Sequence, residues 1–311
     1  MAMPATASRP TDDGTQERAQ IAAFMRNVSF ETTHPTPADL DALKTSTAPA
    51  TPVYVSAIPS RPADEQITTA AALRAAGFEP VPHLAVRNFA TTAELDRYLA
   101  RLSEEAGVTR LLVIGGDRAE PAGFFHHAVE AIDSGLLQGH GIREIGVAGY
   151  PEGHARISEI EMARALAAKI EAAEQTGLTV HIVTQFAFSA EPIVAWIRRL
   201  RDTGFEQTIR VGLAGPASLS ALVRFARICG VKSSAQGLAR NAGLVKHMFG
   251  KTAPDALVRT LAAASTGGRL GDVAPHVYSF GGLAGTARWT SAVAAGRITL
   301  DRAEGFSLAP P

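Results

Sequence analysis

The chain alternates between short apolar runs and longer segments with apolar residues at helical spacing, and this alternation predicts its fold. The clearest unit begins with the apolar run 111–114, breaks at Gly115-Gly116 and delivers one carboxylate, Asp117. An uninterrupted apolar run of this length is typical of a parallel strand buried on both faces. A strand that ends in glycines and a single acid is also how α/β enzymes commonly present a group to a ligand.

The same unit occurs eight times along the chain. A threonine caps the helices expected after Thr36 and Thr91, and the other helices include ones at about 121–135 and from Pro216 onward. Because every connection between strands is a helix, the sheet is expected to be parallel. Strands are expected at 27–33, 52–58, 79–86, 111–114, 144–149, 180–188, 209–215 and 276–282.

Eight strand–helix units in a chain of this length predict a (β/α)₈ TIM barrel. The competing architecture, a doubly wound open sheet, would usually carry GxGxxG after its first strand if it bound a dinucleotide. Here the first strand ends in Glu31-Thr32-Thr33 and is followed by His34-Pro35, so the barrel is favoured. We expect one barrel domain over 23–311, a flexible N-terminal tail over 1–22, and a helical excursion between strands seven and eight.

Composition narrows the class of protein. The 311 residues are 46% hydrophobic, and 30 basic residues balance 30 acidic ones. A net charge of zero argues against nucleic acid as the main partner. No run approaches the length of a membrane span, no secretory signal is evident, and the single Cys229 fits a reducing compartment. We therefore expect a cytoplasmic protein that binds neither nucleic acid nor membrane, with homo-oligomerisation left open.

Polar residues gather where the predicted strands end. In a barrel these ends converge on one face, which carries the active site. A carboxylate partly removed from water there is expected to have a raised pKa, so that it can act as a general acid near neutral pH. The residues expected on this face are Glu31, Ser56, His83, Asp117, Tyr150, Glu152, His154, Gln185, Tyr278 and Ser279.

Other chemistries are less well supported by the sequence. Glu31, His83, Asp117 and His154 could ligate a metal, as in barrel hydrolases, but no HExxH motif is present and no HxH lies on the first strand. A serine nucleophile is not favoured either, because GxSxG is absent. A metal-dependent TIM-barrel hydrolase remains the alternative enzyme class.

The order of five short motifs resembles the methylenetetrahydrofolate reductases. The motifs are SFE at 29–31, PHL at 82–84, GGD at 115–117, AGYPEGH at 148–154 and TQFAF at 184–188. The resemblance covers about residues 25–230 and, faintly, 276–290. It implies a (β/α)₈ barrel that holds FAD and transfers hydride between reduced flavin and a tetrahydrofolate in one-carbon metabolism. NAD(P)H or another electron carrier would be the further partner.

The resemblance also implies roles for individual residues. Glu31 matches the family's general acid, and Asp117 matches the acid beside the pterin and the flavin. Gln185 matches the glutamine that contacts the pterin, and Phe186 and Tyr278 are expected at the substrate. An amide suits a pterin edge because it donates and accepts at once. The positions expected to contact FAD are Ser56, His83, Gly116, Asp117, Ala148, Tyr150, His154 and Lys169.

The chain departs from the family pattern at two places. Gly115 stands where the family commonly has arginine, and Gly281-Gly282 replaces an Asn-Arg pair. Arg288 on the next helix is a candidate replacement for the lost arginine. These changes favour the hypothesis that NADH is a weak donor and that the enzyme oxidises 5-methyltetrahydrofolate with another acceptor.

Two further interpretations stay open. One is a non-catalytic barrel subunit that binds folate or flavin. The other concerns the segment 232–272, whose basic residues could bind a folate polyglutamate tail, although a solvated helical excursion is the simpler interpretation; these residues are Lys232, Arg240, Lys246 and Lys251.

Overall fold

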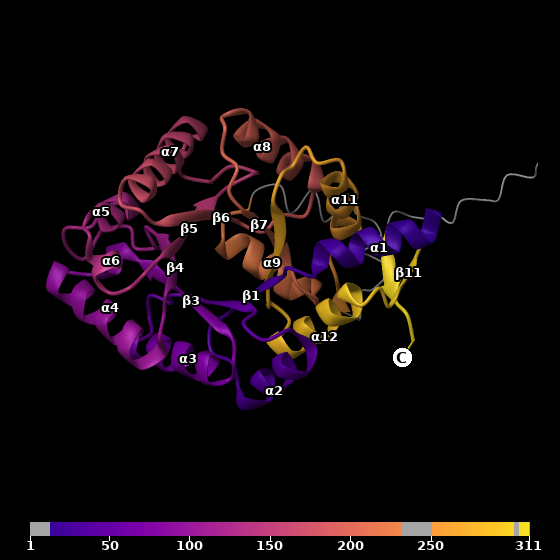
Figure 1. The fold of residues 1–311 in the computed structure, drawn as a ribbon, viewed down its shortest axis with the longest axis horizontal. Coiled ribbons are helices and arrows are strands. Elements are labelled where there is room, and N and C mark those ends of the chain that lie inside the picture. The colour runs from indigo at the N-terminus through magenta and orange to yellow at the C-terminus, as the bar shows by residue number, and fades with distance from the viewer. Residues whose placement is uncertain (1–12, 232–250, 302–304, 311) are drawn as a thin grey trace, which may run out of the picture.

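A closed barrel of eight parallel strands forms the centre of the molecule (Figure 1). The structure is a computed structural model that describes residues 13–231, 251–301 and 305–310. The order around the barrel is β1-β10-β7-β6-β5-β4-β3-β2, as expected for a TIM barrel. The strands are β1 (Ser29–Thr32), β2 (Pro52–Val55), β3 (Glu79–Ala85), β4 (Arg110–Ile114), β5 (Glu144–Gly149), β6 (Thr179–Thr184), β7 (Ile209–Ala214) and β10 (Val273–Tyr278).

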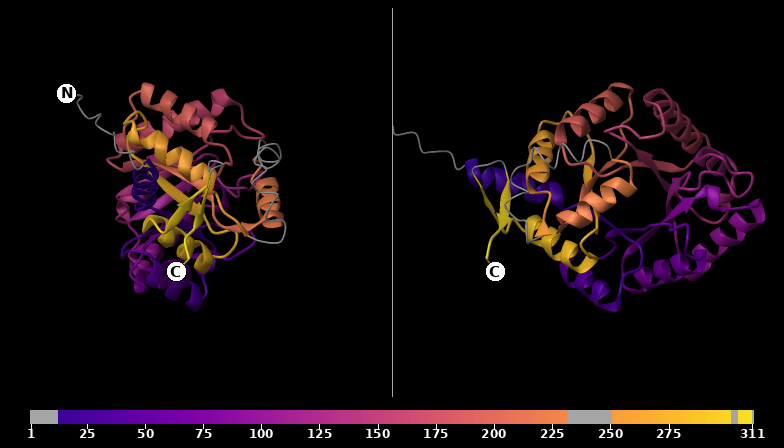
Figure 2. Two further views of the ribbon diagram at one scale, coloured as in Figure 1. Left: turned by 90° about the vertical axis from the view of Figure 1, so that its right-hand side faces the viewer. Right: turned by 180° about the vertical axis from the view of Figure 1, so that it is seen from behind.

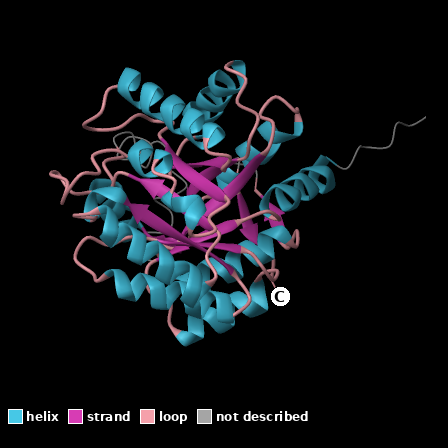
Figure 3. Ribbon diagram, turned by 60° about the vertical axis from the view of Figure 1, so that its left-hand side comes forward, coloured by secondary structure: helices cyan, strands magenta, loops and turns pink. Residues whose placement is uncertain are grey.

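Helices form a ring around this barrel (Figure 3). Thr36 starts one of them with a reciprocal capping box to Asp39, and Ser158 starts another in the same way with Glu161. The ring consists of α1 (Asp13–Met25), α2 (Pro37–Ser46), α3 (Ala63–Ala75), α4 (Thr92–Ala106), α5 (Ala128–Asp133), α6 (Leu136–Gly139), α7 (Glu159–Gln175), α8 (Ala190–Asp202), α11 (Asp255–Thr266) and α12 (Leu283–Ala294), with the short 3₁₀ turn η1 (Val86–Asn88) before α4.

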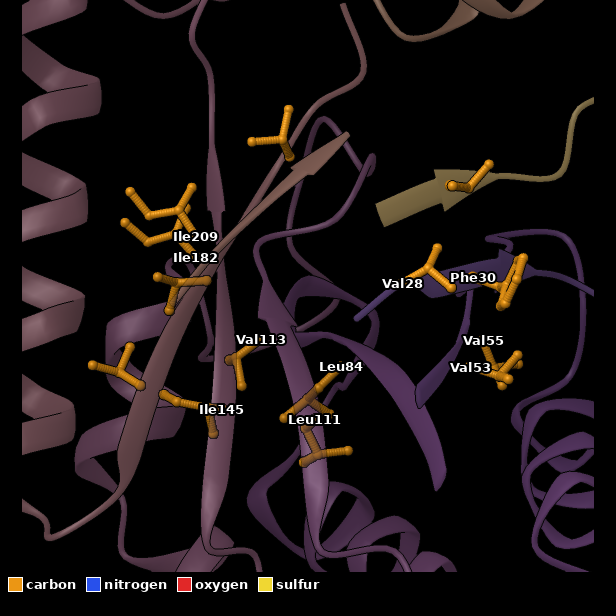
Figure 4. Packing of buried hydrophobic residues seen from close by; sticks show 14 of the residues in the cluster. Val28, Phe30, Val53, Val55, Leu84, Leu111, Val113, Ile145, Ile182 and Ile209 are labelled. Carbon is orange, nitrogen blue, oxygen red and sulfur yellow. The ribbon is translucent and has the colours of Figure 1, made fainter. Parts of the chain in front are cut away.

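Both faces of the central strands are buried, as the apolar runs predict. Leu111 and Val113 of β4 belong to the large core between strands and helices (Figure 4). Leu112 between them points the other way and packs inside the barrel with Tyr54 and Val183. The alternation of side chains along a strand therefore supplies two cores at once.

Two predicted segments near the mouth of the barrel are wrong in detail. Only 128–133 of the helix expected at 121–135 is helical, followed by the separate turn α6. The chain after Pro216 forms the two-residue strand β8 (Ala217–Ser218) before α9 (Leu219–Ile228) begins, because β8 pairs with β9 (Lys251–Thr252). This pairing joins residues more than thirty positions apart, such as Ala217 and Thr252, so it leaves no local sequence signal.

The ends of the chain also differ from expectation. The predicted tail 1–22 is helical from Asp13 onward, and Ile21 is fully buried, because α1 packs against α11 and α12. The last barrel strand lies three to four residues earlier than expected, at Val273–Tyr278. A hairpin of β11 (Ile298–Leu300) and β12 (Phe306–Leu308) follows, and Figure 2 shows it on the same side as α1.

Helix α9 does not join the outer ring but covers part of the barrel mouth (Figure 1). It packs through Leu222, Phe225 and Ala226 against Phe186 and Phe280, which follow β6 and β10. Residues 232–250, which include part of the predicted excursion and Lys232, Arg240 and Lys246, lie outside the described residues. None of the helices in the described ranges is long and apolar enough to cross a membrane.

Candidate active site

A buried carboxylate lies at the C-terminal end of β1. Glu31 Oε1 accepts a hydrogen bond of 2.7 Å from Ser56 Oγ, and its Oε2 lies 3.2 Å from His276 Nε2 and 3.5 Å from His83 Nε2. Glu31 and these three partners come from four strands or the loop just after one of them: β1, β2, β3 and β10. The structure therefore brings together Glu31, Ser56 and His83, which the sequence placed on one face.

The pKa of Glu31 is lowered, which corrects the raised value expected from burial. Burial alone raises the pKa of this carboxyl, but the Coulombic effect of His83 and the hydrogen bonds from His276 and Ser56 outweigh it. Burial in turn lowers the pKa of both imidazoles against the opposing pull of Glu31. At neutral pH the site therefore holds a carboxylate beside two neutral histidines.

Sequence reasoning missed His276. Its side chain is fully buried, its Nδ1 lies 3.0 Å from Ser29 Oγ, and its ring meets that of Tyr54 edge-on at 4.7 Å. The signal was present, because His276 is two residues before Tyr278 and so shares its face of the strand. Because residues two apart on a strand point to the same face, a histidine two residues before a predicted site residue should have been included in the predicted site.

A cavity of 780 Å³ opens between the loops after β4 and β5. Its lining residue Asp117 acts electrostatically on His83, which contacts Glu31. Ligand pockets usually span about 300–1,000 Å³. Four arginines and one lysine line it, against one carboxylate, Asp117. The lining includes six of the eight positions expected to contact FAD: Gly116, Asp117, Ala148, Tyr150, His154 and Lys169.

Lys169 is the clearest indication of the ligand that this cavity would take. Burial lowers the pKa of its ammonium group to about 8, and no described carboxylate pairs with it. An anion in the cavity would relieve this desolvation. Gly116 also lines the cavity, and its φ of +94° and the 2.9 Å between an added Cβ and that of Ala85 both require glycine there. With no side chain at this position, the backbone is open to close approach by a ligand. The residues present thus fit a phosphate-bearing cofactor such as FAD.

The remaining predicted positions divide between two smaller hollows. Ser56 and His83 line a cavity of 210 Å³ together with Arg118 and Tyr98. Gln185 lines a narrow crevice of 10 Å³ with Tyr150 and His154. Its amide oxygen accepts from the backbone N–H of Phe186.

Phe186 and Tyr278 belong to an aromatic cluster rather than to an open wall. Phe186 is 1% exposed and packs edge-on against Tyr278 and Phe280. The hydroxyl of Tyr278 donates to the carbonyl of Thr184. Phe280 in turn stacks on Phe225 of α9, with ring centres 4.2 Å apart. Tyr278 lies next to Glu31 in the sheet, since the two are Cα partners in the β1–β10 pair.

The glycine at position 281, just after the eighth barrel strand β10, has a steric explanation. A Cβ on Gly281 would lie 1.9 Å from the carbonyl oxygen of Pro216, so the loop after β7 occupies the place of a side chain. Arg288 on the next helix is exposed and lowers the pKa of Asp39 of α2, and its role as a replacement for the family's arginine stays a prediction. Among the described residues, no group of three or more His, Cys, Asp and Glu is arranged to hold a metal ion.

Comparison with solved structures supports the fold. A structure described as an uncharacterized protein from Clostridium thermocellum that binds two copies of 5-methyl-5,6,7,8-tetrahydrofolic acid superimposes with a TM-score of 0.54 and 12% sequence identity. The match covers 86% of this chain and 93% of that one. A D-hydantoinase and the dihydropyrimidinase from Brevibacillus agri reach TM-scores of only 0.37 and 0.36, over 61% and 60% of this chain and 46% of each of theirs, at 11% and 10% identity.

The sequence itself gives the family. The profile of methylenetetrahydrofolate reductase matches residues 40–243, which is more than half of the chain and spans β2 through α9. The match includes the loops that carry Asp117, Tyr150 and Gln185. The chain therefore belongs to the methylenetetrahydrofolate reductase family.

Proposed function

We propose that this protein interconverts 5,10-methylenetetrahydrofolate and 5-methyltetrahydrofolate with FAD as its cofactor. The observation that carries the proposal is a cation-lined cavity of 780 Å³ at the ends of β4 and β5, in a barrel that also holds a buried carboxylate, Glu31, at the end of β1. Membership of the family supplies the reaction class. The folate bound by the Clostridium thermocellum protein, a member of the same fold, supports the substrate class.

FAD, when bound, supplies a ring that accepts or gives up a hydride. Lys169 and the arginines of the cavity would hold its phosphates, since they outnumber the single lining carboxylate. Gly116 would let the backbone approach it closely, and Tyr150 and His154 would pack along it. Gln185 is proposed to contact the pterin and Asp117 to supply a fixed charge near pterin and flavin, with Tyr278 on the substrate side.

Glu31 is proposed to move the proton of the reaction. Opening the five-membered ring of methylenetetrahydrofolate needs a proton on the leaving nitrogen, and closing it releases that proton again. With the pKa of Glu31 lowered, the resting site holds a carboxylate, which is ready to accept a proton. This state suits ring closure, the last step of 5-methyltetrahydrofolate oxidation.

The oxidative direction also agrees with the altered strand eight. Gly281-Gly282 stands where the resemblance to the family leads us to expect an Asn-Arg pair, and the exposed Arg288 lowers the pKa of Asp39 on α2. We propose that NADH is a weak donor for this protein. Another electron carrier would then take electrons from the reduced cofactor.

A second candidate is a barrel that binds two folates in place of one folate and a flavin. The described residues line both a 780 Å³ and a 210 Å³ cavity beside the mouth, and the Clostridium thermocellum protein binds two folates. Such a protein would be colourless and would bind folate with a stoichiometry of two.

The deciding experiment is an absorption spectrum of the purified protein, with and without added FAD, followed by anaerobic addition of 5-methyltetrahydrofolate or NADH. Flavin absorption that is bleached by the folate and hardly by NADH supports the proposal. Equal bleaching by both would refute weak NADH use. A protein that takes up no FAD refutes the flavin mechanism, and calorimetry would then count bound folates.

The role of Glu31 has its own test. Glu31→Gln should still bind FAD but should no longer produce methylenetetrahydrofolate from 5-methyltetrahydrofolate. Glu174→Gln, an exposed change on α7, is the matched control and should behave as the unchanged protein. Turnover that survives Glu31→Gln would show that another group moves the proton.

A further inference from the structure

The two oxygens of Glu31 lie in different surroundings. Oε2 faces the barrel interior, where it meets His276 Nε2 at 3.2 Å and His83 Nε2 at 3.5 Å. Oε1 faces Ser56, whose side chain lines the 210 Å³ cavity. Ser56 and His83 both line this cavity, so the two oxygens differ in their partners: Oε2 meets ring nitrogens, and Oε1 meets a hydroxyl that can rotate.

The tautomer of His276 follows from the carboxylate that it meets. Ionised Glu31 can only accept hydrogen bonds, so His276 Nε2, at 3.2 Å from Oε2, must carry the imidazole hydrogen and donate it. Nδ1 is then an acceptor. Ser29, the Cα partner of His276 in the β1–β10 register, has its hydroxyl 3.0 Å from Nδ1 and can donate to it, in place of the contact of 3.4 Å with the carbonyl of Pro275.

Ser56 offers the other oxygen a partner in both protonation states. Its hydroxyl donates to Oε1 at 2.7 Å and can instead turn to the carbonyl of Thr32 at 3.4 Å. A hydroxyl that gives its hydrogen to Thr32 has lone pairs free to accept from a protonated Oε1. One rotation of a single bond thus satisfies Glu31 as carboxylate and as acid.

We propose that His276, held by Ser29, keeps its Nε2–H on Glu31 Oε2, so that Oε1 is the oxygen that takes and returns the proton, with the Ser56 hydroxyl turning to follow it. Ser29, His276 and Ser56 are positioning residues in this arrangement. The inference rests on the proposed function for the reaction that supplies the proton. In ring closure the substrate N–H bond breaks and an O–H bond forms at Oε1, while the electron pair of the N–H bond stays on nitrogen.

The surroundings of His276 agree with a neutral ring. The rings of Tyr54 and Tyr278 meet it edge-on, at 4.7 and 5.0 Å. Of the charged or titratable groups around it, Arg210 and His181 lower the pKa of the imidazole, and only Glu31 raises it. Around Glu31 itself, His83 is a further neighbour, and Asp117 acts on His83 in turn. Glu31 also raises the pKa values of Tyr54, Cys229 and Tyr278.

The first test reads the tautomer directly and needs no turnover. Nitrogen-15 NMR of the histidine-labelled full chain, with His276→Gln used to assign its signals, should show the Nε2–H tautomer from pH 6 to 8. A signal from the Nδ1–H tautomer, or from a charged imidazole at pH 7, would overturn the proposal. This result holds whether or not the protein proves to be a flavoenzyme.

The second test follows the proton through the pH dependence of turnover at saturating FAD. Ser56→Ala removes the donor to Oε1, so the acidic limb of the pH profile should move up by about one unit. Ser56→Thr keeps a hydroxyl and should restore the limb. An acidic limb that stays in place in Ser56→Ala, or that Ser56→Thr fails to restore, would refute the role of Ser56. A protein without folate turnover would fail the proposed function instead, and the NMR result would still stand.

Discussion

Replacing Lys169 with methionine should stabilise the cofactor-free protein while weakening its affinity for FAD. Burial lowers the pKa of this ammonium group from 10.5 to about 8. Methionine has a similar length and no charge to desolvate, so the change removes the cost of burial. The same change removes a cation from a cavity that we expect to hold phosphates.

The magnitude follows from the shift in pKa. A difference of 2.5 units corresponds to about 3 kcal/mol, and partial exposure of the side chain reduces this to about 2 kcal/mol. The folded pKa lies below the unfolded one, so the cost is fully present below pH 8 and disappears as the pH rises from 8 to 10.5. Lys169→Met should therefore be more stable than the unchanged protein at pH 7 and equal to it near pH 10.5.

The affinity for FAD should depend on pH in the opposite sense to stability, falling as the pH rises. An anion that binds the charged lysine restores its pKa, so the affinity of the unchanged protein should fall about tenfold between pH 7 and pH 9. Lys169→Met should bind FAD more weakly at pH 7, with little change up to pH 9. Thermal denaturation without cofactor and fluorescence titration with FAD measure the two effects.

Lys44→Met, on the exposed face of α2, is the control for removing a positive charge. It should leave both the stability and the affinity as they are. A cofactor-free Lys169→Met that is less stable than the unchanged protein at pH 7 would refute the reasoning. So would an affinity of the unchanged protein that does not vary between pH 7 and pH 9.

Three other changes test the fold around the site. Burial raises the pKa of Asp255 from 3.8 to about 7 despite a hydrogen bond from Trp289, so the free energy of unfolding falls as the pH rises from 3.8 to 7. Asp255→Asn should raise the free energy of unfolding by up to about 4 kcal/mol at pH 8 and leave it unchanged below pH 3.8, as measured by urea titration. Tyr54→Phe removes the hydroxyl 2.6 Å from His181 Nε2 inside the barrel and should cost about 1–3 kcal/mol; an unchanged melting temperature would contradict this. Gly116→Ala should cost about 1–3 kcal/mol and more than Gly77→Ala, which shares the positive φ but has open space for a Cβ; equal losses would show that the contact with Ala85 is unimportant.

The sequence predicted the barrel well because its signals are local. The run 111–114 is apolar without interruption, and the structure buries Leu111 and Val113 outside and Leu112 inside. The caps at Thr36 and Thr91 predicted the starts of their helices correctly. Each of these features depends only on residues a few positions apart.

The errors occurred where distant segments decide the structure. Pairing of β8 with β9 replaces the start expected for a helix at Pro216, and packing on α11 and α12 orders the helix α1 within the predicted tail. The pKa of Glu31 was misjudged for the same reason. Its value depends on His276, which is 245 residues away in the chain and comes beside it only through the closure of β1 on β10.

The contact between Gly281 and Pro216 limits how this chain can evolve. The carbonyl of Pro216 stands 1.9 Å from where any side chain at position 281 would begin. The asparagine that the resemblance to the family leads us to expect at this position therefore does not fit the present path of the loop after β7. Exchanging residue 281 alone should fail, because the loop that carries Pro216 would have to move as well. The loop and the strand end can therefore change only together.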